Sequence, residues 1–239
     1  MIAHIFIPCF IDQLYPQTGF NMVKVLEKAG CSVIYNPGQT CCGQPAFNAG
    51  FWDDARAVAG KFMHDFEDAQ YVVVPSASCT GFVRNYIPKI FEDHAQSNKA
   101  LATKKKVYEF TEFLTDVLHQ TDFGATLNIK ATYHDSCAAL RECNIKSGPR
   151  ELLSHVKGLE LVEMEDTETC CGFGGTFAVK FNGISIAMGE QKIQHAADTN
   201  AKVIISTDLS CLMHLDGCIK NKNMTMEVMH VADVLASGW

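Results

Sequence analysis

Eleven cysteines occur in this 239-residue chain, and four of them form two adjacent pairs. Each pair is followed by a glycine, in Cys41-Cys42-Gly43 and again in Cys170-Cys171-Gly172. A thiolate is a nucleophile and also a soft ligand that suits zinc, copper(I) and iron–sulfur clusters. Neighbouring thiols of this kind therefore indicate a metal-binding or redox site.

Further cysteines flank each pair at similar distances in the two halves of the chain. The 31 residues between Cys9 and the first pair correspond to the 32 residues between Cys137 and the second pair. Another cysteine follows the first pair after 36 residues and the second pair after 39. The candidate ligands thus form two matching sets, Cys9, Cys41, Cys42 and Cys79 in the first half and Cys137, Cys170, Cys171 and Cys211 in the second.

Segments typical of strands and helices surround the two sets in the same order. In the first half, strand patterns cover residues 2–9, 31–35, 71–74 and the start of 107–114, and helical patterns cover 21–29 and 52–68. In the second half, strand patterns cover 130–134, 159–164, 202–206 and the start of 228–235, and helical patterns cover 150–156 and 184–197. Strands that alternate with helices imply parallel sheets with right-handed crossovers.

The sequence therefore predicts an α/β fold of two tandem repeats, each a small parallel, Rossmann-like sheet flanked by helices, related by a pseudo-two-fold axis. We place the first repeat at residues 1–122 and the second at 123–239, with a polar seam over 120–128. In open parallel sheets, ligands bind at the carboxyl ends of the strands. The single cysteines of each set follow predicted strands there, and the glycine of each Cys-Cys-Gly turn permits a positive φ and close backbone approach.

Other roles explain these cysteines less well. Disulfides are disfavoured because adjacent residues rarely bond to each other and because no secretion signal is recognisable. Burial in a core accounts for single cysteines but not for two matching pairs. A structural zinc site with four thiolates remains an alternative. An iron–sulfur cluster suits adjacent thiolates better, because neighbouring sulfurs can bind different iron atoms.

At these residues the sequence resembles the cysteine-rich "CCG" family, whose members include one component of heterodisulfide reductase and the iron–sulfur subunit of glycolate oxidase. The resemblance covers essentially the whole chain and rests on the stretches 41–46, 170–177 and 210–212. It implies one iron–sulfur cluster per repeat, of the [4Fe-4S] type. It also implies an electron-transfer subunit of an oxidoreductase complex that oxidises L-lactate or a related 2-hydroxy acid, with a ferredoxin-like iron–sulfur protein as partner.

The chain departs from the family pattern, in which each repeat ends with Cys-x-x-Cys. Ser76 stands three residues before Cys79, and Asp208 stands three residues before Cys211. Each set thus offers four sulfurs, which is enough for a conventional cluster, and the five-cysteine non-cubane form is not carried over. Either residue could provide an oxygen ligand or could cap a helix.

Several other residues have two interpretations. His134 and His214 lie three residues from Cys137 and Cys211, and they are either ligands or hydrogen-bond donors to sulfur, or polar residues near strand ends. The remaining cysteines have no counterpart in the other half, and we expect Cys31 and Cys218 to fill the core; the third is Cys143.

The charge and hydropathy of the chain limit its partners. The formal net charge is −7, and the only basic run spans residues 104–106, so we expect no nucleic-acid binding. No apolar run is long enough to span a membrane, which predicts a cytoplasmic protein and leaves room only for peripheral membrane association. Two functions stay open beside electron transfer, namely a zinc-binding scaffold or assembly protein and thiol–disulfide chemistry at a cluster, as in the heterodisulfide reductase relatives.

Overall fold

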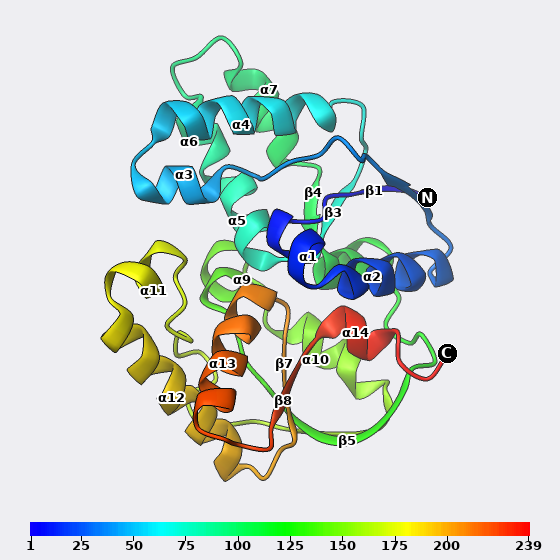
Figure 1. Ribbon diagram of the computed structural model, residues 1–239. Coiled ribbons are helices and arrows are strands. Elements are labelled where there is room, and N and C mark those ends of the chain that lie inside the picture. Colours follow the sequence, from blue (N-terminus) through cyan, green and yellow to red (C-terminus); the bar gives the residue numbers. More distant parts are fainter.

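The chain folds into two four-stranded parallel sheets, one in each half, in a computed structural model that describes residues 1–239. The strand orders, β2-β1-β3-β4 and β6-β5-β7-β8, have the same topology. Figure 1 shows the first half above the second. The strands are β1 (Ile2–Ile5), β2 (Ser32–Tyr35), β3 (Val72–Val74), β4 (Val107–Glu109), β5 (Thr126–Tyr133), β6 (Lys157–Val162), β7 (Val203–Ser206) and β8 (Glu227–His230). The predicted tandem α/β fold is confirmed.

Helices follow the strands in both halves (Figure 1). The first half contains α1 (Cys9–Leu14), α2 (Pro16–Lys28), α3 (Gln44–Ala49), α4 (Trp52–Asp65), α5 (Ala77–Asn85), α6 (Ile87–Ile90), α7 (Ser97–Lys104), α8 (Phe110–Glu112) and the π-helical turn η1 (Phe113–Val117). The second half contains α9 (Cys137–Glu142), α10 (Ser147–Ser154), α11 (Thr176–Lys180), α12 (Asn182–Asp198), α13 (Leu209–Asn221) and α14 (Val231–Leu235).

Two predicted boundaries differ from the structure for local reasons. The first strand ends at Ile5 and not at Cys9, because Pro8 occupies the N-cap position of α1. Strand β5 begins at Thr126, inside the predicted seam, because it pairs with β6 through an irregularity between Thr126 and Ile129. The helix predicted at 21–29 begins earlier, at Pro16, and the other predicted elements lie within a few residues of their predicted positions. The sequence patterns did not predict several helices, among them α5 and α13, which carry Cys79 and Cys211.

Matching backbone hydrogen bonds put the two repeats in register. The Phe6 N–H donates to the Val73 carbonyl at 3.0 Å, and the His134 N–H donates to the Ile205 carbonyl at 2.8 Å. Each donor follows the last residue of a central strand, β1 or β5. Phe6 and His134 therefore occupy equivalent positions.

The long helices α4 and α12 bury equivalent faces. The buried positions in and just after α4 are Ala55, Ala59, Phe62, Met63 and Phe66, and those of α12 are Ser185, Gly189, Lys192, Ile193 and Ala196. The two series run in parallel with a constant offset. Lys192 in the second repeat thus takes the place of Phe62 in the first.

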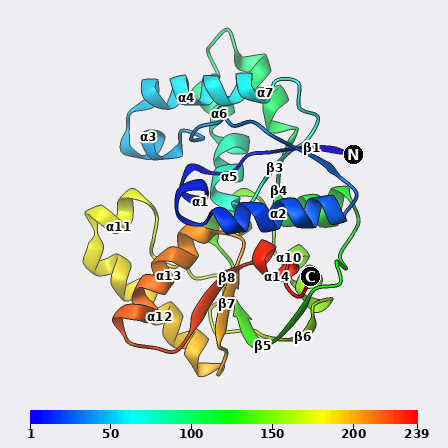
Figure 2. The same cartoon turned by 45° about the vertical axis from the view of Figure 1, so that its right-hand side comes forward.

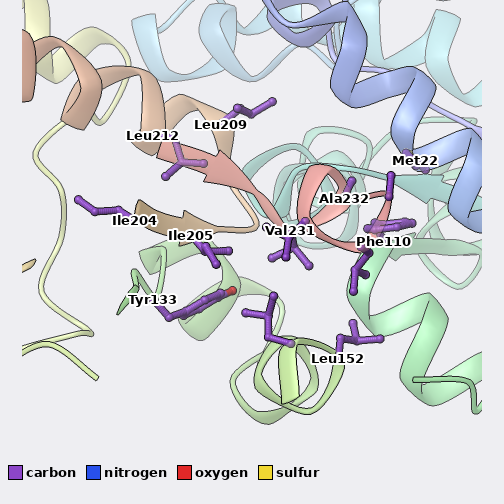
Figure 3. Close-up of a cluster of buried hydrophobic side chains, with 14 of the residues drawn as sticks. Met22, Phe110, Tyr133, Leu152, Ile204, Ile205, Leu209, Leu212, Val231 and Ala232 are labelled. Atoms are coloured by element: carbon purple, nitrogen blue, oxygen red, sulfur yellow. The ribbon is translucent and has the colours of Figure 1, made fainter. Parts of the chain in front are cut away.

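One apolar core runs through both halves. The larger cluster of 38 buried residues includes Met22 of α2 and Phe110 of α8 from the first half. Figure 3 shows these side chains beside Tyr133, Leu152 and Val231 from the second half. Figures 1 and 2 both place α2 against the second half, where it packs on α14. The halves are therefore joined by hydrophobic burial as well as by the chain.

Polar contacts also cross between the halves. The Asp233 carboxylate of α14 accepts hydrogen bonds from the Thr18 hydroxyl at 2.9 Å and from the Asn21 side-chain amide at 2.8 Å, both on α2. The Asn85 side-chain amide donates to Glu142 at 2.9 Å. The last element of the first half ends at Val117, and the first strand of the second half begins at Thr126. The predicted domain boundary at 122/123 lies between them and stays a prediction.

Candidate metal centres

The four single cysteines of the two sets all lie in the first turn of a helix that follows a strand. Cys9 and Cys137 begin α1 and α9, and Cys79 and Cys211 are the third residues of α5 and α13. These helices begin at the carboxyl ends of β1, β5, β3 and β7. The single cysteines therefore lie at the carboxyl edge of each sheet, as expected.

Capping side chains fix the start of three of these helices. The Ser76 hydroxyl accepts a hydrogen bond from the Cys79 N–H at 3.4 Å, and the Asp208 carboxylate accepts one from the Ser210 N–H at 3.4 Å. Ser136 caps α9 in the same way. The geometry thus supports the helix-cap interpretation of Ser76 and Asp208, because their side-chain oxygens are engaged by backbone N–H groups.

The glycine of each Cys-Cys-Gly turn is required by its backbone. Gly43 has φ of 99° and Gly172 has φ of 94°, in the left-handed region. A Cβ on Gly172 would lie 2.5 Å from the Ser185 carbonyl oxygen, and one on Gly43 would lie 3.1 Å from that of Ala55. The turn N–H groups donate to sulfur, from Gly43 to Cys41 and from Gly172 to Cys170, both at 3.4 Å.

In the first repeat the four thiols form a continuous row. The hydrogen bond donated by the Cys42 thiol, followed by that from Cys9, lowers the pKa of Cys41 to about 2. The pKa values of Cys9 and Cys42 are raised, first because each donates to Cys41. Cys42 also lies in hydrogen-bonding contact with Cys79. Cys42 is buried, Cys41 and Cys79 are partly exposed and Cys9 is exposed, so the row reaches the surface at Cys9.

In the second repeat the row repeats itself. The thiols of Cys137 and then of Cys171 lower the pKa of Cys170 to about 2 by hydrogen bonding. Cys171, whose pKa is raised chiefly by donating to Cys170, also contacts Cys211. All eight predicted cysteines are thus brought together in two groups of four, and all eleven cysteines are free thiols.

This donor set fits a soft metal. Four sulfurs from three separate segments meet in each repeat, and the lowered pKa of Cys41 and of Cys170 favours the thiolate, the form that binds metal. The protein groups around them are N–H donors, which stabilise negatively charged sulfur. Each group therefore has the chemistry of a thiolate-ligated metal centre.

The two predicted histidines differ sharply in their surroundings. The His134 ring is fully buried, both of its nitrogens lack a hydrogen-bond partner, and it groups with Cys171 and Cys211 within 4.8 Å. Burial lowers the pKa of His134 to about 4. By contrast, Nε2 of His214 lies 3.1 Å from the Ser185 carbonyl and serves the protein backbone.

Lys192 was not among the residues predicted from the sequence. Its side chain is 1% exposed, and its ammonium donates to the backbone carbonyls of Asp166 and Thr167, in the loop that leads to Cys170. Burial lowers its pKa, although the Asp166 carboxylate and then the sulfur of Cys171 oppose this effect. The only sequence signal was a lysine on the buried face of a helix.

The unmatched cysteines have separate roles. Cys31 and Cys218 belong to the large apolar core, which confirms the expectation for both. Cys143 lies in a small cluster with Ala77 and Ala139, and its thiol donates to the Ala77 carbonyl at 3.4 Å.

A polar cavity of about 760 Å³ opens beside Cys170. Arg141 and Arg150 line it together with the loop that Lys192 holds. The Arg150 guanidinium is committed to the protein, because it donates to both carboxylate oxygens of Asp135, at 2.9 and 2.8 Å, and also pairs with Glu163 at 2.6 Å. The second thiol group therefore reaches solvent at Cys170, through a cavity lined mainly by charged and polar residues.

A duplicated parallel α/β fold with a four-thiol group at one edge of each sheet defines a class of tandem cysteine-rich proteins. A family profile described as "Cysteine-rich domain", CCG, matches residues 3–84 and 131–216. The chain belongs to this family. None of its helices combines the length and apolar character that crossing a bilayer requires.

Relatives resemble the chain over its whole length. Lactate utilization protein A of Geobacillus sp. (strain WCH70) is 43% identical over 238 residues, covering 99% of this chain and 100% of that protein. The protein of the same name from Bacillus subtilis (strain 168) is 42% identical with the same coverage. Lactate utilization protein A 2 of Bacillus cereus (strain 03BB102) is 41% identical over 239 residues, covering 100% of this chain and 99% of that protein.

A solved structure shares the fold. A hypothetical protein from Helicobacter pylori superposes with a TM-score of 0.62 at 11% identity. The match covers 100% of this chain but only 49% of that one, so this chain spans about half of its length.

Proposed function

We propose that the chain is an iron–sulfur electron-transfer subunit of an oxidoreductase complex that oxidises L-lactate or a related 2-hydroxy acid. The observation that carries the proposal is the meeting of four thiols in each repeat, each row with a sulfur of low pKa. The names of the relatives, lactate utilization protein A, support the pathway.

The ligands in this proposal are the eight matched cysteines, four for each cluster. Four sulfurs per repeat suit a [4Fe-4S] cluster, which would supply one-electron storage when bound. The chain's own residues prepare the site: Gly43 and Gly172 bring the backbone close, and the turn N–H groups offset charge on sulfur. The first row reaches the surface at the exposed Cys9, and the second reaches the polar cavity at the half-buried Cys170. Both places suit electron exchange with a ferredoxin-like partner in the cytoplasm.

A zinc-binding scaffold is the second candidate. The group of His134, Cys171 and Cys211 within 4.8 Å favours it, because mixed histidine and cysteine ligands are typical of structural zinc. Against it, adjacent thiols in both repeats suit a polynuclear cluster.

Analysis of protein purified without oxygen separates the two candidates. We expect about four iron and four acid-labile sulfide per repeat, with low-temperature EPR signals after reduction. Zinc without sulfide would establish the scaffold instead. Loss of lactate-dependent electron transfer by the assembled complex when this subunit is omitted tests the pathway separately.

A further inference from the structure

The surroundings of the two thiol groups differ in one specific respect, although the repeats are in register. At the end of the central strand, the first repeat has Phe6 where the second has His134. Phe6 packs edge-to-face against Phe62 at 4.9 Å and against Phe66 at 5.9 Å between ring centroids. The first thiol group is therefore backed by three aromatic rings.

In the second repeat, polar side chains replace two of these rings and an alanine replaces the third. His134, Lys192 and Ala196 stand at the positions of Phe6, Phe62 and Phe66. Both His134 and Lys192 are buried, and the Lys192 ammonium donates to the backbone carbonyls of Asp166 and Thr167. The space that aromatic side chains fill behind the first group is thus used for an imidazole and an ammonium behind the second.

The His134 ring is available to donate a hydrogen bond to sulfur, because neither of its nitrogens has another partner. Its two ring nitrogens have no partner in the protein, and Cys171 and Cys211 lie within 4.8 Å of the ring. An imidazole carries at least one N–H donor in any protonation state found in proteins. A buried N–H donor without an acceptor lowers the stability of the fold. The position of the His134 ring beside two sulfurs therefore points to a hydrogen bond from its N–H to the second thiol group.

Each group also has contacts of its own that favour negative charge on sulfur. In the first group, the backbone N–H groups of Phe10 and Cys42 donate to Cys9 and Cys41. The second group has two such contacts. The Phe173 N–H donates to Cys171 sulfur at 3.5 Å, in addition to the Gly172 contact that both repeats share. The Lys192 ammonium interacts electrostatically first with the Asp166 carboxylate and then with the sulfur of Cys171. The lysine that holds the corresponding loop in the first repeat, Lys61, is 42% exposed and is paired with Asp65.

We infer that the two centres are not equivalent, and that His134 and Lys192 give the centre of the second repeat the higher reduction potential. This inference rests on the proposed function. Reduction adds one negative charge to a cluster, and hydrogen bonds to sulfur and nearby positive charge stabilise that charge. One electron then moves from the first centre, which is oxidised, to the second, which is reduced, without bond or proton transfer.

Single-centre variants make the comparison direct. Cys42→Ala leaves only the second centre, and Cys171→Ala leaves only the first. Redox titration of each, followed by EPR, is expected to give a higher midpoint potential for the Cys42→Ala protein. Equal potentials, or the reverse order, would overturn the inference.

Substitution of His134 tests the cause. In the Cys42→Ala background, His134→Phe, which restores the residue of the first repeat, is expected to lower the potential, whereas His134→Gln, which keeps an N–H donor, retains most of it. His214→Gln is the matched control and leaves the potential unchanged. In the Cys171→Ala background, Phe6→His raises the potential of the first centre. Iron and sulfide content is measured for every variant, so that loss of the cluster is not mistaken for a shift.

The outcomes separate this inference from the proposed function. Absence of iron and sulfide from the parent protein would overturn the proposed function. Two intact clusters whose potentials do not respond to His134→Phe would overturn only the inference.

Discussion

The carboxylate of Asp208 in the second repeat accepts a hydrogen bond from the backbone N–H of Ser78 in the first repeat, at 2.9 Å. Ser78 precedes Cys79, and Asp208 caps the helix that carries Cys211. The same carboxylate accepts from the N–H and the hydroxyl of Ser210. One buried side chain therefore ties the two thiol groups together.

Removal of this carboxylate is expected to destabilise the protein. Asp208→Ala leaves the Ser78 and Ser210 N–H groups without their charged acceptor, at a cost of about 2–3 kcal/mol in the free energy of unfolding. Urea denaturation followed by circular dichroism measures the cost. Asp216→Ala, which removes a carboxylate paired with Lys220 on the surface, is the control and should cost under about 1 kcal/mol. Equal effects from the two variants would refute the bridging role.

Gly172→Ala is expected to disrupt the second thiol group. The new Cβ would lie 2.5 Å from the Ser185 carbonyl oxygen at a φ of 94°, so the turn must shift. We expect a loss of about 2 kcal/mol or more in stability together with loss of metal at the second site. Gly50→Ala has a similar φ of 89° with no atom within 4 Å, so it isolates the backbone strain, at about 1 kcal/mol, with metal content unchanged. Full metal content in Gly172→Ala would contradict this account.

The unmatched cysteines should be dispensable for metal binding. Cys31→Ala and Cys218→Ala remove buried sulfur from the core and are expected to cost about 1–2 kcal/mol in stability. Iron and sulfide content should match that of the parent protein after anaerobic reconstitution. Loss of a cluster in either variant would show that the matched sets are incomplete.

Glu109 predicts a pH dependence of stability. Burial raises the pKa of this carboxyl group to about 8, although hydrogen bonds from Thr111 and Glu112 oppose the shift. The ordinary pKa of a glutamate is 4.5, so between pH 4.5 and about 8 this group is protonated in the folded protein and ionised in the unfolded chain. The free energy of unfolding therefore falls as pH rises through this window. Glu109→Gln keeps an acceptor for the cap of α8 and removes the titration.

Urea midpoints at pH 6 and pH 8 check this prediction. The parent protein should lose more stability between the two pH values than Glu109→Gln does. Glu92→Gln, at an exposed carboxylate, should follow the parent. A parent and a Glu109→Gln protein with the same pH slope would show that Glu109 does not titrate in this range.

The repetition of cysteine types and spacing predicted most of the architecture. The match of Cys9 with Cys137, and of the two cysteine pairs with each other, was sufficient to predict the tandem repeat. Ligands bind at the carboxyl ends of parallel strands, so cysteines repeated at the same spacing indicate that the sheet is repeated too. The parallel sheets and the place of the single cysteines at the strand ends followed from the alternation of strands and helices. The strand order and the helices α1, α5, α9 and α13 that carry these cysteines were not predicted.

The inequivalence of the two sites was beyond prediction from the sequence. Whether His134 is buried without a partner depends on what α12 packs against it, and periodicity does not report this. Lys192 lies on a helix whose buried face includes Ser185 and Gly189, so its apolar stripe is weak in the sequence. Likewise, the reach of Asp208 into the first repeat is a long-range contact that no local pattern encodes.

The continuous core beneath both repeats has a consequence for the proposed electron transfer. Met22, Phe110 and Val231 pack in a single cluster, so neither repeat can tilt without exposing apolar surface. The gap between the two thiol groups is therefore held constant as the protein meets its partners. Under the proposed function, a fixed gap sets one tunnelling rate between two bound clusters, and a protein cut into two separate halves would lose this spacing.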